Sequence, residues 1–134
     1  MNMHVFTYGS LMFAEVWQRV VRGHYASYTA MLDGYRRFAV RDDTYPGIIA
    51  SSGSTVEGLV YTDVDTADLA RLDDFEGALY RRIDAEVTAA DGHTLKAQTY
   101  LCLQPDCLSD QPWVPESFAL SRFLATYCRD KLGS

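Results

Sequence analysis

An Asp-Gly pair between two alternating stretches is the feature that most restricts the fold of this chain. Hydrophobic and polar residues alternate from Ile83 to Thr88 and again from Leu95 to Leu101, and Asp91 and Gly92 lie between these stretches. Asp-Gly at such a position is typical of a tight turn that joins two antiparallel strands. The sequence therefore predicts a β-hairpin in the second half of the chain.

Four further stretches have the composition of strands. Met3–Gly9 is short, apolar and aromatic, whereas Tyr25–Val40 is rich in Tyr, Thr and Phe and bends at Gly34, either as one long strand or as a broken one. A turn signal at Thr44–Gly47 precedes a short apolar strand, and Ser54–Val64 alternates as a separate strand. Together with the hairpin, these stretches predict about six strands.

Three helical segments are expected between and after these strands. The first carries apolar residues at i, i+3, i+4, i+7 and i+8, which are Phe13, Val16, Trp17, Val20 and Val21. The second begins at Asp65 or Thr66 and ends near Gly77, and the third begins at Pro115. The core face of the third helix is predicted at Leu120, Phe123, Leu124 and Tyr127.

Strands and helices follow one another in mixed order, which argues against a doubly wound parallel sheet. The sequence instead predicts an α+β fold. We expect a small, mixed, strongly curved sheet that closes or nearly closes into a β-barrel of about six strands, with about three helices packed against it. The 134 residues are enough for one domain with a real core, so a single domain over residues 1–134 is expected.

Composition and charge argue against several classes of function. Acidic residues outnumber basic ones and give a net charge of −6, which argues against a protein that binds the phosphates of a nucleic acid or an anionic membrane surface. The N-terminal residues show no basic stretch followed by an apolar run, so no signal peptide is expected, and no apolar run is long enough to cross a bilayer. The expected partner is a small molecule, and the oligomeric state stays open.

The cysteines and histidines give no sign of a metal site. Cys102, Cys107 and Cys128 are odd in number and lack CxxC spacing, so we interpret them as reduced thiols of a cytoplasmic protein. The three histidines are scattered along the chain without ligand spacing. We expect neither a metal ion nor another cofactor.

A carboxylate at the end of the second predicted helix is the first candidate for chemistry. The apolar face of this helix includes Leu69 and Leu72, and one turn further it reaches Glu76, just before Gly77. Glu76 is either a structural partner of an arginine at position 71, 81 or 82, or a partly desolvated group. In the second case, burial and the negative end of the helix raise its pKa from about 4.3 towards neutrality. A carboxyl group with such a pKa suits general acid–base catalysis at neutral pH.

The segment Thr7–Leu11, with the sequence Thr-Tyr-Gly-Ser-Leu, is the second candidate. Gly9 allows a sharp turn between the first strand and the first helix, and the amides from Ser10 onward have no helical acceptor. Unpaired amides at such a turn can bind an anion, although the same pattern is common in ordinary turns. The lack of a GxSxG elbow and of an evident His–acid pair argues against Ser10 as a nucleophile.

Four motifs, in this order, resemble the γ-glutamylcyclotransferase-like superfamily, and most closely its γ-glutamylamine cyclotransferase branch. They are Tyr-Gly-Ser-Leu at 8–11, Tyr-Pro-Gly-Ile at 45–48, Val-Glu-Gly-Leu-Val-Tyr at 56–61 and Leu-Asp-Asp-Phe-Glu-Gly-Ala-Leu-Tyr-Arg-Arg at 72–82. The resemblance runs from about Met3 to Leu101. It implies a small β-barrel with helices around one cavity, in which Glu76 is the catalytic glutamate. The residues that it implies for the glutamyl end of the substrate are Tyr8, Gly9, Ser10 and Leu11.

The reaction implied by this resemblance releases a free amine and 5-oxoproline from a γ-glutamyl amine or amide. The α-amine of the substrate attacks its own γ-carbonyl, so no serine or cysteine nucleophile is required. Glu76 would remove a proton from the amine and return it to the leaving group, while the loop amides would bind the α-carboxylate. Further substrate-binding residues expected at the cavity are Tyr45, Tyr80 and Tyr100.

Two other functions stay open. The first is a protein of the same fold that binds a small carboxylate without turnover, although a pure binder has no need of a carboxylate that faces an anionic ligand. The second is a related amide-forming or amide-cleaving step in a biosynthetic pathway. The sequence does not identify the leaving amine, because a fold does not fix a substrate. We expect the segment Gln104–Ser134, which lies outside the resemblance, to help shape the leaving-group pocket.

Overall fold

The fold is known from a computed structural model, which describes residues 2–41, 43–115 and 120–128. In this part of the chain the strands are β1 (Met3–Thr7), β2 (Ser27–Val40), β3 (Pro46–Val64), β4 (Tyr80–Ala89), β5 (Thr94–Cys102) and β6 (Leu108–Pro112). The α-helices are α1 (Ala14–Val20), α2 (Thr66–Glu76) and α3 (Leu120–Phe123), and α3 continues as a π-helical turn over Leu124–Cys128. Short 3₁₀ turns cover Ser10–Met12, Gly77–Leu79 and Pro105–Cys107.

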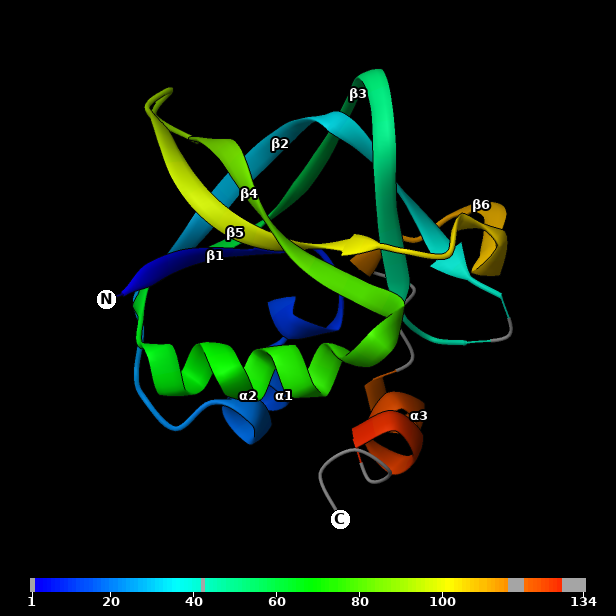
Figure 1. The fold of residues 1–134 in the computed structure, drawn as a ribbon, viewed down its shortest axis with the longest axis horizontal. Coiled ribbons are helices and arrows are strands. Elements are labelled where there is room, and N and C mark those ends of the chain that lie inside the picture. The colour runs from blue at the N-terminus through cyan, green and yellow to red at the C-terminus, as the bar shows by residue number, and fades with distance from the viewer. Residues whose placement is uncertain (1, 42, 116–119, 129–134) are drawn as a thin grey trace.

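The sheet closes on itself, as the sequence predicts. Its strands are paired in the order β3-β1-β5-β4-β2, and β2 pairs again with β3, so five strands form a barrel (Figure 1). β6 is added outside this ring on β2. β1 and β5 run parallel, whereas the other pairs are antiparallel, which gives the mixed sheet that was expected.

The predicted hairpin is present, and its turn is the expected one. β4 and β5 pair from Tyr80↔Cys102 to Thr88↔Thr94. Gly92 has a φ of +94°, and its amide donates to the carbonyl of Ala89 across the turn at 2.9 Å. Glycine adopts this backbone conformation without the steric penalty of other residues, which explains the Asp-Gly signal.

The two long strands, β2 and β3, wrap around the barrel because both bend. The register of their pairing shifts between Asp33 and Tyr35, where Gly34 has a φ of +87°. Gly53 has a φ of +84° on the partner strand. The sequence suggested two strands on either side of Gly53, but β3 is a single strand, because a glycine can bend a paired strand without ending it.

α1 and α2 pack on the same side of the barrel (Figure 1). α2 begins as predicted, because the side chain of Asp65 accepts a hydrogen bond from the amide of Asp68, and it ends at Gly77, which has a φ of +75°. α1 ends at Val20, short of the predicted end near Gly23. The buried residues between helices and barrel include Val16, Trp17, Tyr61, Leu69, Leu72 and Phe75.

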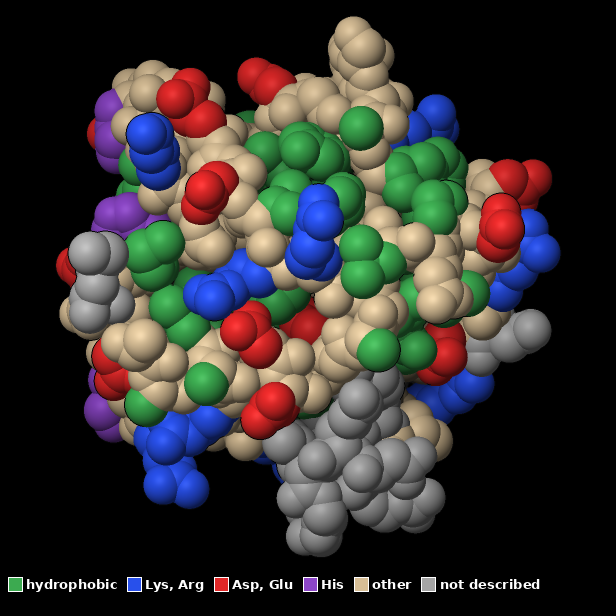
Figure 2. Space-filling model, viewed as in Figure 1, with side chains coloured by type: hydrophobic (Ala, Val, Ile, Leu, Met, Phe, Trp, Pro, Cys, Tyr) green, Lys and Arg blue, Asp and Glu red, His purple; other side chains and the backbone are tan. Residues whose placement is uncertain are grey.

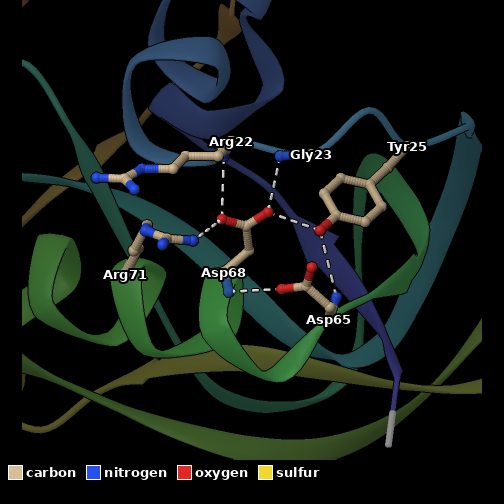
Figure 3. A network of polar contacts seen from close by, with 6 residues as sticks. All are labelled: Arg22, Gly23, Tyr25, Asp65, Asp68 and Arg71. Atoms are coloured by element: carbon tan, nitrogen blue, oxygen red, sulfur yellow. Dashed lines mark hydrogen bonds and ion pairs between the residues drawn. The ribbon is translucent and has the colours of Figure 1, made fainter.

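A buried carboxylate joins the two helices (Figure 3). Asp68 on α2 is 1% exposed and accepts hydrogen bonds from the amides of Arg22 and Gly23, at 3.0 and 2.9 Å. The hydroxyl of Tyr25 donates to it at 2.6 Å, and Arg71 forms an ion pair with it. These donors are all on α2 or in the loop after α1, so Asp68 fixes that loop against α2.

One face of the molecule can be followed in the space-filling view (Figure 2). On the face that β4 and β5 present, positive and negative side chains are interspersed rather than gathered by sign (Figure 2). Among the described residues, no helix combines the length and hydrophobicity that crossing a membrane requires. Cys102 and Cys107 are free thiols, as expected, while the side chain of Cys128 lies outside the described residues.

Candidate active site

A cavity lies where the end of β1, the start of β3 and the end of α2 meet. Its wall consists of Phe6, Thr7, Tyr8, Gly9, Ser10, Leu11, Tyr45, Pro46, Phe75, Glu76, Tyr80, Tyr100 and Phe123. All eight residues that the sequence assigns to the site are in this wall, including Glu76 and the loop of Tyr8–Leu11. Among the described residues, Glu76 is the one charged side chain in the wall.

The cavity is narrow. The space not filled by protein atoms, including the part open to solvent at its mouth, is about 410 Å³. The centre of a water-sized sphere can reach only about 20 Å³ of this space. That is room for about one water molecule. A larger ligand therefore requires the surrounding side chains to move apart, and many of these are aromatic rings.

The loop after β1 is fixed from two directions. Gly9 lies against Pro46, because a Cβ atom at position 9 would be only 2.7 Å from the Cδ and Cγ atoms of Pro46. On the other side, the Arg37 guanidinium donates to the carbonyl of Tyr8 at 2.6 Å. Arg37 itself is held by Trp113. Its Nε atom donates to the carbonyl of Trp113 at 3.0 Å, and its guanidinium lies over the Trp113 ring, 5.1 Å from the ring centre. The loop thus has a defined position at the cavity.

The first amides of this loop precede the first hydrogen bond of the 3₁₀ turn that follows it. The 3₁₀ turn Ser10–Met12 begins with a hydrogen bond from the amide of Met12 to the carbonyl of Gly9, at 3.0 Å. The amides of Ser10 and Leu11 precede this bond and so have no acceptor within the turn. Both residues are in the cavity wall, as an anion-binding loop requires.

Glu76 is the last residue of α2 and is half-buried. Its negative charge acts on the tyrosines around the cavity. Burial raises the pKa of Tyr8 well above its ordinary value, and Glu76 is the next cause of that increase. The pKa of Tyr45 rises to about 12, mainly through burial and Asp43, with a contribution from Glu76. The carboxylate of Glu76 is therefore close enough to the phenol groups to disfavour a second negative charge there.

The three arginines that the sequence offered as structural partners of Glu76 lie on α2 and β4. Arg71 forms its ion pair with Asp68, and Arg82 lies 3.3 Å from Asp73. Arg81 is exposed on β4 and is not among the described residues of the cavity wall. Two of the three arginines named in the structural alternative for Glu76 thus form ion pairs with other carboxylates.

Three tyrosine hydroxyls at the cavity donate to protein acceptors. Tyr8 donates to the carbonyl of Tyr100 at 2.7 Å, and Tyr80 to the carbonyl of Pro46 at 2.6 Å. The hydroxyl of Tyr100 donates to the carboxylate of Asp73 at 2.7 Å. Burial, this hydrogen bond and the charges of Asp73 and Glu76 raise the pKa of Tyr100 strongly, so it stays protonated.

Several parts of the site were not identified from the sequence. The wall also contains Phe6, Pro46, Phe75 and Phe123, and Arg37 and Asp73 support it from behind. Thr7, the first residue of the candidate segment Thr7–Leu11, is in the wall as well. Pro46 follows Tyr45 in a motif that was recognised as a turn and as part of the family resemblance, without a role at the site for the proline. Phe123 was expected on a core face and is 1% exposed, with its ring 6.2 Å from those of Tyr45 and Phe75. Leu124 is half-buried, while the side chains of Leu120 and Tyr127 lie outside the described residues.

Within the part of the chain that the structure describes, no group of three or more His, Cys, Asp or Glu side chains is placed to hold a metal ion. The polar side chains of the cavity wall are the carboxylate of Glu76 and the hydroxyl groups of tyrosine, serine and threonine residues.

Comparison with known proteins identifies relatives over most of the chain. Residues 5–117 match the family described as "Gamma-glutamyl cyclotransferase, AIG2-like". The chain is 33% identical over 104 residues to the Arabidopsis thaliana protein named "Protein AIG2 C", a match that covers 77% of this chain and 63% of that protein. The chain thus spans less than two thirds of the length of this relative.

Solved structures show the same fold. A solution structure of an Arabidopsis thaliana protein superposes with a TM-score of 0.73 at 26% identity, covering 96% of this chain and 89% of that chain. A structure named "Gamma-glutamyl cyclotransferase" superposes with a TM-score of 0.69 at 19% identity, covering 98% of this chain and 80% of that chain. The second likeness concerns the fold alone.

Proposed function

Because this chain belongs to the γ-glutamyl cyclotransferase, AIG2-like family, we propose that it releases an amine and 5-oxoproline from a γ-glutamyl amine or amide. The relative named above is longer than this chain, so the proposal concerns the activity of the domain described here. The observation that carries it is the meeting of Glu76 and the Tyr8–Leu11 loop, distant in sequence, in the wall of one cavity.

The reaction needs one nucleophile, and the substrate contains it. The nitrogen of the α-amine forms a bond to the γ-carbonyl carbon and closes a five-membered lactam. The bond from that carbon to the leaving nitrogen then breaks, and the leaving nitrogen gains the proton that the α-amine loses. Atoms and charges balance without water or a cofactor. The task of the protein is to fold the substrate so that the two reacting atoms meet.

Glu76 is proposed as the group that moves the proton. As a carboxylate it accepts a proton from the attacking nitrogen, and as a carboxylic acid it donates that proton to the departing amine. Its position at the end of α2, in the wall of a narrow cavity, is suited to a group that must contact both nitrogens.

The loop after β1 is proposed to hold the carboxylate end of the substrate. The amides of Ser10 and Leu11 lack acceptors within their turn and can donate to a carboxylate or to the developing oxyanion. Arg37 and Pro46 fix the loop, so these donors are oriented before the substrate binds.

The test is a panel of γ-glutamyl compounds with different leaving amines, among them alkyl amines, the lysine ε-amine, polyamines and amino acids. We expect wild-type protein to form 5-oxoproline and the matching free amine in equal amounts from at least one class. Formation of glutamate instead would indicate hydrolysis. If ligands bind but none of the panel yields 5-oxoproline, the alternative of a small-carboxylate-binding protein explains the cavity better.

A further inference from the structure

Arg37 joins three segments of the chain that are far apart in the sequence. It lies on β2, and its Nη1 atom donates to the carbonyl of Tyr8, just after β1, at 2.6 Å and to the carbonyl of Glu57, on β3, at 3.2 Å. Its Nε atom donates to the carbonyl of Trp113, just after β6, at 3.0 Å. One guanidinium group can make these bonds together, because it carries five N–H donors in a fixed plane.

Trp113 connects a second segment of the cavity wall to the same arginine. Its ring lies beneath the guanidinium of Arg37, at 5.1 Å from the ring centre. Its indole N–H donates to the carbonyl of Thr44 at 2.9 Å, in a position that is shielded from water, since Trp113 is 7% exposed. Thr44 directly precedes Tyr45 and Pro46, which are both in the cavity wall.

The two wall segments that Arg37 and Trp113 connect also contact each other. A Cβ atom at position 9 would be 2.7 Å from the Cδ and Cγ atoms of Pro46, so Gly9 and Pro46 are in close contact. Neither Arg37 nor Trp113 is among the described residues of the wall. They therefore act on these segments from outside the cavity.

The hydrogen bond to Tyr8 fixes more than one atom of the loop. The carbonyl of Tyr8 and the amide of Gly9 belong to one planar peptide group, in which the C=O and N–H bonds point in opposite directions. Rotation of this group would break a hydrogen bond between a charged donor and a residue that is 7% exposed, which is costly. Arg37 thus sets the direction of the first amide of the loop.

We propose that Arg37 and Trp113 are positioning residues, which hold the Tyr8–Leu11 loop and the Thr44–Pro46 turn in the relative placement that binds the glutamyl part of the substrate. This inference rests on the proposed function, since both residues act on the substrate through the loop and the turn. It gives the segment Gln104–Ser134 a role at the glutamyl end of the substrate, through Trp113, in addition to the role expected at the leaving group.

The first experiment compares Arg37→Met with Arg36→Met. Arg36 is the preceding residue of β2, is exposed and lies over the ring of Phe38 at 5.0 Å from its centre, away from the described cavity wall. Each variant thus loses one charge and one cation–π contact. Arg37→Met should lower kcat/KM for a γ-glutamyl compound by about 10- to 100-fold, the usual effect of displaced binding groups, and should weaken 5-oxoproline binding. Arg36→Met should change neither.

A double-variant cycle separates positioning from a mere loss of stability. If Arg37 acts by placing the loop, Arg37→Met should add little to the loss in kcat/KM that Gly9→Ala causes, because the loop is then already displaced. Tyr25→Phe removes a hydrogen bond of 2.6 Å to Asp68, away from the described wall. It should lower the melting temperature and keep the kcat/KM of the folded protein.

Two milder variants keep the test available if Arg37→Met does not fold. Trp113→Phe keeps an aromatic ring beneath Arg37 but cannot donate to Thr44. Arg37→Lys keeps the charge but has no planar fork to join Tyr8 and Trp113. Each should lower kcat/KM less than Arg37→Met, and the losses of Trp113→Phe and Arg37→Lys should also be less than multiplicative when combined with Gly9→Ala.

The outcomes separate the positioning role from the reaction. If 5-oxoproline forms, but Arg37→Met only lowers the melting temperature as Tyr25→Phe does, or its loss multiplies with that of Gly9→Ala, the positioning role is wrong and the proposed function stands. If no γ-glutamyl compound is turned over, the reaction is wrong. The cycle measured with 5-oxoproline dissociation constants then supports the positioning role if the losses are less than multiplicative, and overturns it otherwise. Wild-type protein that neither turns over the panel nor binds 5-oxoproline overturns both.

Discussion

At the scale of single residues, Glu76 is in the cavity wall and is proposed to move the proton in the reaction. Glu76→Gln keeps the shape of the side chain and its hydrogen-bonding capacity but cannot accept a proton. The rate of 5-oxoproline formation should fall by roughly two to four orders of magnitude, the usual contribution of general acid–base catalysis. Single-turnover measurements with wild-type and variant protein check this.

Ser10→Ala is the control for that experiment, because the loop is proposed to act through its amides, which this change leaves in place. Its effect should be much smaller than that of Glu76→Gln. An inactive Ser10→Ala protein beside an active Glu76→Gln protein would contradict the mechanism and indicate a serine nucleophile.

Gly9 is the residue where the loop and the start of β3 are closest. An alanine at position 9 would bring its Cβ to 2.7 Å from Pro46, so either the loop or Pro46 must move. Because displacement of binding groups by about 1 Å can cost about 100-fold in rate, Gly9→Ala should lower kcat/KM by about 10- to 100-fold. Gly53→Ala is a suitable control: its φ of +84° makes the change destabilising, but Gly53 is outside the described cavity wall. The melting temperature of Gly53→Ala should be lower than that of wild type, whereas its kcat/KM, measured where the variant is folded, should equal the wild-type value.

At the scale of elements, Asp68 joins α2 to the loop after α1, and its charge makes that junction sensitive to acid. Burial raises the pKa of Asp68, but hydrogen bonds from Tyr25, the amides of Arg22 and Gly23, and Arg71 outweigh burial and lower it to about 2. A carboxyl group with a lowered pKa stabilises the fold above its unfolded pKa of about 3.8. This contribution, about 2 kcal/mol, is lost as the pH falls from about 4 to about 2.

At pH 6, the free energy of unfolding of Asp68→Asn should therefore be lower than that of wild type by about 2 kcal/mol or more. This difference should shrink as the pH approaches 2. Urea denaturation at a series of pH values measures this. Asp74→Asn, an exposed change on the same helix, should stay within about 0.5 kcal/mol of wild type. A difference between Asp68→Asn and wild type that does not vary with pH would show that the charge of Asp68 contributes nothing.

α3 contributes Phe123 to the cavity wall, and the narrowness of the cavity makes this ring a candidate for selecting the leaving amine. Phe123→Leu keeps the position apolar and reduces its volume. We expect kcat/KM for bulky leaving amines to rise several-fold relative to small ones. The same ratio for Leu103→Ala, a change at an exposed residue outside the described wall, should not move. An unchanged ratio for Phe123→Leu would place the leaving group elsewhere.

At the scale of the whole molecule, the sequence predicts the elements that are specified by neighbouring residues. Asp91 and Gly92 define the β4–β5 turn, and Asp65 and Gly77 define the ends of α2, because caps and turns depend on local backbone geometry. The predicted number of about six strands agrees with the structure only because two differences cancel. The two strands expected around Gly53 are one, and β6 was not expected.

β6 could not be predicted from its residues. Leu108–Pro112 does not alternate and contains a proline, and it is a strand because Val40↔Leu108 and Phe38↔Pro112 pair it with the end of β2. The residues of the site also fall into those that the sequence identifies and those that it does not. Glu76 and the loop could be identified from motifs, whereas Arg37 and Asp73 act through contacts with residues far along the chain. Such contacts are set by the tertiary structure.

The cavity is assembled from β1, β3, α2, β4, β5 and α3, so it exists only when the whole barrel is folded. A ligand of this cavity binds the folded chain and not the unfolded one, and at about 100 times its dissociation constant it stabilises the fold by about 2.7 kcal/mol. We expect 5-oxoproline at that ratio to raise the melting temperature of wild-type protein by roughly 10 °C. Glu76→Gln should keep most of the shift, because the loop amides are unchanged, whereas Gly9→Ala should lose most of it. The opposite pattern would mean that the product is held by the charge at position 76 and not by the loop, and would move the carboxylate end of the substrate away from Ser10 and Leu11.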